Sequence, residues 1–176
     1  LDAQIDFDYG DEELMAAHGS VDGGRLRIGE MSYATVVVPP SINMRATTLA
    51  RLRNFARAGG SIMFVGSVAH LLDGEPSDEV RAFVDEYARR VVDGPDHFDY
   101  RGAIDAVTEL GGRTVTAHGA DGADVPQLKV HRRRWDGCEI VYLANVSRDA
   151  ISANVAVSFD VDGTVEEWAP DTGETR

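Results

Sequence analysis

Acidic side chains near the amino terminus are the first residues whose type and spacing could do chemistry. Asp6 and Asp8 alternate with Ile5 and Phe7, so we expect the two carboxylates to share one face of a short strand. Glycoside hydrolysis requires two carboxylates that face each other across a sugar. Tyr9 follows Asp8 at the expected carboxyl end of the strand, where open α/β sheets collect ligands. We therefore take Asp8 and Tyr9 as candidate sugar-binding residues, with a solvated acidic helix start as the structural alternative.

A serine and a histidine follow an apolar run, where they could act as nucleophile and base. Ser67 comes directly after Gly66, and His70 lies three residues further on. Serine elbows at strand-to-helix turns expose a nucleophile in this way, but the second glycine of the elbow is absent here. The histidine of a catalytic triad also arrives from a distant loop. We therefore predict no catalytic residue, expect Ser67 to cap a helix, and keep His70 as a third candidate ligand-binding residue.

Metal and cofactor sites are not predicted. The five histidines are scattered along the chain, and Cys138 is the one cysteine, so no pair has zinc-ligand spacing and no internal disulfide can form. The glycines do not form the Gly-x-Gly-x-x-Gly series of nucleotide-binding loops. We expect no metal, nucleotide or flavin.

Charge excludes two classes of partner. The chain has 30 acidic and 17 basic residues, which gives a net charge of −13 and repels phosphate backbones and anionic membrane surfaces. The cluster Arg132–Arg134 falls in an expected strand, where we expect its charges to pair with carboxylates. No segment approaches the roughly 20 apolar residues that span a bilayer. The chain begins at Leu1 in mid-pattern, so we expect a longer parent polypeptide, whose localisation stays open.

Strand and helix patterns alternate over residues 1–125. Apolar positions recur at helical spacing between Arg45 and Ala58, and two glycines then end the pattern. Residues 35–38 and 61–65 are continuous apolar runs, as in strands buried on both faces of a parallel sheet. This β-α-β order predicts a right-handed parallel crossover. The other expected elements are strands over residues 5–9, 25–28 and 113–116, and helices over 77–92 and 101–110.

The pattern changes after residue 125, because only alternating, strand-like runs follow. Two of the turns between these runs contain Asp-Gly, which favours hairpins. We therefore predict two domains, an α/β domain over residues 1–125 and an antiparallel β meander over residues 126–176 that forms part of a β-sandwich. The runs are residues 127–134, 139–144, 151–159 and 164–168.

Two blocks of the sequence resemble parts of large bacterial glycoside hydrolases. The first block comprises SYATVVVPP (residues 32–40), MRATTL (44–49) and FARAGGSIMFVG (55–66). It is similar to the glutamine-amidotransferase-like domain that follows the catalytic barrel in β-galactosidases and α-L-rhamnosidase-like enzymes. The second block, IVYLAN (140–145) and WAPDTGE (168–174), resembles their β-sandwich. The resemblance implies a three-layer, flavodoxin-like or class I glutamine-amidotransferase-like parallel sheet, followed by the β meander.

The resemblance also implies a function. Such enzymes carry their paired carboxylates on a barrel that this chain does not contain, so the chain would be a non-catalytic accessory domain whose partner is the catalytic barrel of the parent chain. A carbohydrate and a second copy of the chain are further candidate partners. Two alternatives remain: a stand-alone module that binds carbohydrate or protein, and a small α/β hydrolase or amidotransferase-like enzyme, which the incomplete elbow disfavours.

Overall fold

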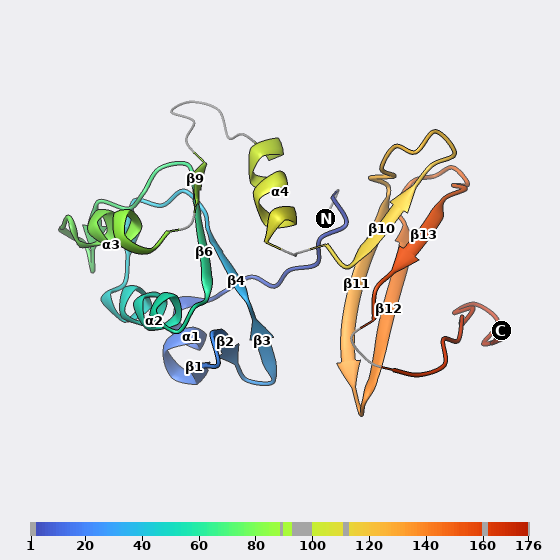
Figure 1. The fold of residues 1–176 in the computed structure, drawn as a ribbon, viewed down its shortest axis with the longest axis horizontal. Coiled ribbons are helices and arrows are strands. Elements are labelled where there is room, and N and C mark those ends of the chain that lie inside the picture. Colours follow the sequence, from blue (N-terminus) through green and yellow to red (C-terminus); the bar gives the residue numbers. More distant parts are fainter. Residues whose placement is uncertain (1–2, 89, 93–99, 111–112, 160–161, 176) are drawn as a thin grey trace. The chain divides into compact units, whose positions relative to one another are not determined.

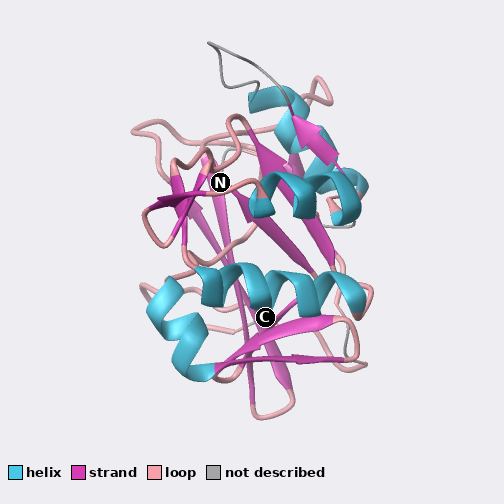
Figure 2. Cartoon of the chain, turned by 90° about the vertical axis from the view of Figure 1, so that its left-hand side faces the viewer, coloured by secondary structure: helices cyan, strands magenta, loops and turns pink. Residues whose placement is uncertain are grey.

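The computed structural model describes all residues except 1–2, 89, 93–99, 111–112, 160–161 and 176. Contacts divide the chain into two compact units (Figure 1). One unit comprises residues 7–112, and the other comprises residues 113–176 together with residues 1–6. Most strands in both units are short, whereas β11 (Leu128–Trp135) and β12 (Cys138–Asn145) have eight residues each (Figure 2).

A three-stranded parallel sheet lies at the centre of unit 7–112. Its order is β4 (Thr35–Val38), β6 (Ser61–Val65) and β9 (Arg90–Val92). The helices of this unit are α1 (Glu12–His18), α2 (Ala46–Arg57), α3 (Glu79–Tyr87) and α4 (Tyr100–Glu109). The remaining strands form two small sheets, β1 (Gly19–Asp22) with β2 (Arg25–Ile28) and β3 (Met31–Tyr33), and β5 (Asn43–Met44) with β7 (Leu71–Leu72) and β8 (Glu75–Pro76).

The central strand β6 is buried on both faces. Ile62 and Phe64 belong to the main core, which they share with α2 and α3, and the Phe64 and Phe83 rings meet edge to face at 6.2 Å. Met63 and Val65 alternate with them and pack with Ala106 of α4 in a separate cluster. The continuous apolar run of β6 therefore follows from burial of both of its faces, as the sequence indicated.

The prediction of a flavodoxin-like, three-layer parallel sheet is wrong. Only three of the described strands enter the parallel sheet, because the other expected strands go elsewhere. Residues 5–9 form no strand. The segment from Gly19 to Tyr33 folds into the antiparallel sheet β1-β2-β3, with Gly23 and Gly24 both at positive φ in the first turn. The strand expected at residues 113–116 lies in the other unit.

The described residues of unit 113–176 form two separate antiparallel pairs of strands. Strand β10 (Val115–His118) pairs with β13 (Asn154–Val157), and β11 pairs with β12. Asp136 and Gly137 connect β11 to β12 with φ of 49° and 76°, the positive values that a two-residue type I′ hairpin requires. Because β13 joins β10 rather than β12, the expected sequential meander is also wrong. The last expected run contributes only a bridge between Trp168 and Thr175.

Residues near the amino terminus belong to unit 113–176 through two side chains. Gln4 is 2% exposed, and its amide donates to the carbonyls of Ala117 and Val125 while its oxygen accepts from the Ala117 N–H. The Asp6 carboxylate accepts a 2.8 Å hydrogen bond from the Arg132 N–H. These contacts provide the long-range polar partners that buried backbone groups need.

Candidate functional site

Asp8 and Tyr9 lie in the segment that precedes α1. The Tyr33 hydroxyl donates a 2.8 Å hydrogen bond to Asp8 Oδ2, which connects the segment to the end of β3. The Tyr9 side chain is 92% exposed, and its ring meets that of Phe7 edge to face at 5.1 Å. We call Phe7, Asp8, Tyr9 and Tyr33 the aromatic segment. It combines exposed rings with a carboxylate that another element of the unit holds in position.

His70 lies in a different part of unit 7–112, in the loop after β6. Its backbone N–H donates to the Ile42 carbonyl at 3.2 Å, and its carbonyl accepts from the Ser77 N–H. The contacts of Asp8 and Tyr9 lead to β3 and to Phe7, whereas those of His70 lead to the loop after β4. His70 as a ligand-binding residue stays a prediction.

The loops that follow β4 and β6 are joined to each other. The Ser41 N–H donates to the Ser67 carbonyl at 3.3 Å, and β5 and β7 then pair in parallel. Pro40 packs closely on Gly66, where an added Cβ would lie 2.7 Å from the proline Cγ. The strand-end region, which in larger α/β sheets is a ligand crevice, is therefore bridged by the protein's own backbone.

Ser67 and His70 show no catalytic arrangement. Both are exposed, and no hydrogen bond joins their side chains among the residues that the structure describes. Ser67 is followed by a loop and then β7 rather than by a helix, so the expected helix cap at Ser67 is wrong. A nucleophile and its base need to lie within hydrogen-bond reach.

Carboxylates occupy the amino end of α2. Asp73 Oδ1 accepts from the Ala46 N–H at 3.0 Å, and Glu12 accepts from the Arg45 N–H at 3.2 Å. The Arg45 guanidinium donates to Glu13 at 2.9 Å, and this hydrogen bond raises the pKa of Arg45. The partial positive charge at a helix start attracts anions, and here it meets groups from α1 and from the β7–β8 turn.

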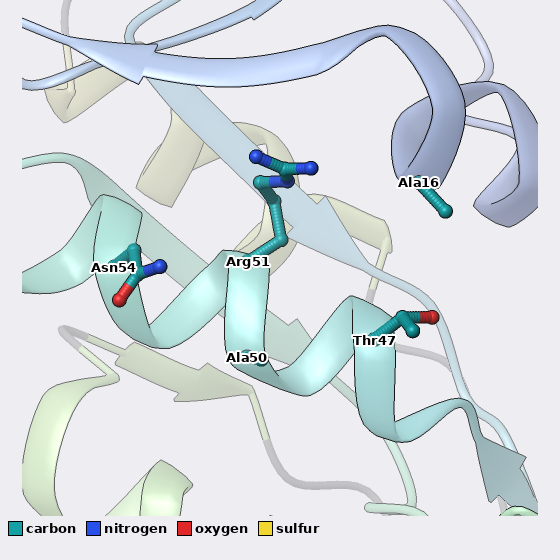
Figure 3. Close-up of a pocket in the computed structure, with 5 residues that line it drawn as sticks. All are labelled: Ala16, Thr47, Ala50, Arg51 and Asn54. Carbon is teal, nitrogen blue, oxygen red and sulfur yellow. The ribbon is translucent and has the colours of Figure 1, made fainter.

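A small open hollow of about 300 Å³ lies between α1 and α2 (Figure 3). Arg51 and Asn54 come from successive turns of α2, and Ala16 belongs to α1. None of the candidate residues from the sequence lines it. Alanine at positions 16 and 50 leaves space there, a feature that helical periodicity alone does not reveal.

A polar cluster surrounds Asp124 in unit 113–176. Arg113 donates to Asp124 at 2.7 Å and to Gln4 Oε1 at 2.8 Å, and His118 Nδ1 lies 3.1 Å from Asp124 Oδ1. The hydrogen bond from Arg113 lowers the pKa of Asp124. The cluster was not predicted from the sequence, because Gln4 and Arg113 are more than 100 residues apart. Its contacts hold the amino-terminal segment against β10.

No group of three metal-binding side chains gathers within the described ranges, which leave out His97. Among the same residues, no helix is long and apolar enough to cross a bilayer.

Comparison with known proteins gives no relative, because no family model, no curated protein and no solved structure matches the chain. The resemblance to glycoside hydrolase domains gains no support from these comparisons.

Proposed function

We propose that this chain is a non-catalytic accessory domain of a glycoside hydrolase and that it contacts carbohydrate through the aromatic segment. The observation that carries the proposal is the 92% exposure of Tyr9 beside Phe7, next to a carboxylate that Tyr33 holds. An apolar ring left in water forgoes the stabilisation that burial provides, so a neighbouring pair of exposed rings favours a binding role.

The chemistry of the segment suits a sugar. The flat ring of Tyr9 offers a π face whose negative potential attracts the C–H groups of a pyranose. The Asp8 carboxylate offers acceptor oxygens, and hydrogen bonds to charged groups are stronger than those between neutral partners. Tyr33 fixes the orientation of that carboxylate, and a group positioned before binding loses less entropy when a ligand arrives.

The contacts of the nearby acidic side chains support a non-catalytic role. Asp11 caps α1 by accepting from the Glu13 and Leu14 N–H groups, each at 2.9 Å. Glu12 and Glu13 bind Arg45. Hydrolysis of a glycoside needs a second carboxylate across the sugar from the first, and these three acids are engaged in structural contacts.

The test is a titration of the chain with rhamnose, galactose and their oligosaccharides, followed by amide chemical shifts. We expect shifts at residues 7–9 and 33, with dissociation constants of about 1 mM or above, since two exposed rings and one carboxylate provide little binding energy. Tyr9→Ala and Asp8→Asn should remove the shifts. Tyr142→Ala, which truncates another exposed tyrosine, should leave them unchanged. Absence of shifts at the aromatic segment with every sugar would overturn the proposal.

If the chain were instead a small α/β hydrolase or amidotransferase-like enzyme, the isolated chain would have hydrolytic activity. Assays with simple esters and aryl glycosides should show no turnover above buffer. Turnover that Ser67→Ala abolishes would instead favour a small hydrolase.

A further inference from the structure

The two edges of the hairpin β11–β12 differ in how well they are protected against pairing with another strand. On the β11 side, the Arg132 N–H points outward and donates to Asp6, so this edge is capped by a carboxylate. The strand also carries Arg133 and Arg134. Charged residues on an edge strand discourage the addition of another strand, and β11 is therefore protected.

The pairing register of the hairpin shows which N–H and C=O groups of β12 point away from β11. Residues opposite each other in an antiparallel pair either both bond across the pair or both point outward. Arg132 is opposite Val141 and Val130 is opposite Leu143. Because the Arg132 N–H points away from β12, the N–H and C=O groups of Val141 and Leu143 point away from β11. Among the described strands, β12 has β11 as its sole neighbour.

The side chains of β12 do not protect this edge. Its one charged residue is Glu139, whose side chain is fully buried and bound by Arg132 and Arg134 at 2.6 and 2.7 Å. Ile140 and Tyr142 are 51% and 54% exposed. A long, apolar edge without lysine or proline is a template for strand pairing.

We propose that β12 pairs antiparallel with β12 of a second copy of this chain, with Val141 on the two-fold axis. In this register Ile140 faces the partner's Tyr142, an aromatic and β-branched pair of the kind that stabilises sheets. Glu139 faces the partner's Leu143, so no charge opposes a like charge. A second copy fits because β12 is complementary to itself, and two-fold dimers use one surface twice. The β11 edge would instead set arginines against arginines.

Net charge opposes the association. Two copies with a charge of −13 each repel one another, whereas the pairing edge is apolar and bonds through its backbone. Repulsion between exposed charges is screened by salt. The dimer is therefore expected to strengthen as ionic strength rises, the opposite of an interface that ion pairs hold together.

Sedimentation of the chain over about 1 µM to 1 mM tests the proposal. We expect the mass to rise with concentration from 19.1 kDa towards twice that value, and to rise further at high salt. Val141→Lys and Val141→Glu should each weaken association at least about tenfold, because like charges then lie directly opposite. Mixing the two variants should restore the dimer, since Lys and Glu meet only if Val141 lies on the axis.

His131→Lys is the matched control, because it adds a charge on the same hairpin but on β11. It should leave the dimer intact, and circular dichroism should show that all variants are folded. Two results would overturn the proposal: a monomeric mass at every concentration and salt, or association that Val141→Lys leaves unchanged. Failure to recover the dimer on mixing folded variants would overturn the two-fold register.

Discussion

Asp124 owes its lowered pKa first to the hydrogen bond from Arg113. The two side chains are 2.7 Å apart, and His118 Nδ1 lies 3.1 Å from the same oxygen. The sequence gives no sign of this cluster, because a charged pair eleven residues apart has many alternative partners in an acidic chain. The turn after β10 brings them together when His118 and Asp124 form a bridge.

The free energy of unfolding should fall in acid partly through Asp124. A carboxyl with a lower pKa in the folded protein stabilises it fully above its unfolded pKa of about 4. That stability is lost as the pH falls through the lower folded pKa. We therefore expect the free energy of unfolding, measured with urea, to fall less between about pH 5 and pH 2 in Asp124→Asn than in the unchanged protein. Asp149→Asn, at an exposed loop position, is the control, and its free energy of unfolding should fall as much as that of the unchanged protein. An equal fall in the two variants would contradict the role given to Asp124.

At the scale of elements, several local predictions are confirmed. The helix expected from Arg45 to Ala58 is α2, and its Leu49, Leu52 and Phe55 are buried as the periodicity indicated. The helix expected over residues 77–92 ends at Tyr87, and residues 90–92 form β9 beside β6. Two consecutive valines suit a strand, and pairing with β6 decides the outcome.

The packing of α2 on β6 requires a glycine at position 60. A Cβ at this position would overlap the ring of Phe55, which is fully buried. Gly60→Ala should lower the free energy of unfolding by about 1–3 kcal/mol, the usual cost of overpacking. Urea unfolding measures the change. Gly10→Ala is the control, since an added Cβ there meets nothing within 4 Å, and its effect should stay within about 0.5 kcal/mol. Equal effects of the two substitutions would refute the packing argument.

At the scale of the molecule, the amino-terminal residues belong with unit 113–176 rather than with the residues that follow them. Gln4 attaches this segment to the unit through its hydrogen bonds with Ala117, Val125 and Arg113. Loss of a buried hydrogen-bonding side chain leaves its partners unsatisfied, which costs about 1–3 kcal/mol.

Gln4→Ala should therefore speed amide hydrogen exchange in β10 and β13, starting at Ala117, whose N–H donates to Gln4. Amides of β6 should keep their protection, because they belong to the other compact unit. Gln127→Ala, at an exposed position, should leave exchange unchanged throughout. Equal loss of protection in β6 and β10 would show that the two units unfold together.

The sequence by itself determined the local elements: the apolar face of α2, the strands β4 and β6, and the Asp136-Gly137 turn. These depend on side-chain periodicity and on backbone preferences within a few residues. The expected burial of β4 on both faces was wrong, because Val37 is 44% exposed. Only the tertiary structure decided which strands pair, that Gln4 joins β10 and that the loops after β4 and β6 close on each other. A strand pattern specifies which face is apolar but not which edge will find a partner. Pairing is fixed by contacts between residues distant in the chain, and that is why the local elements were foreseen and the parallel-sheet architecture was not.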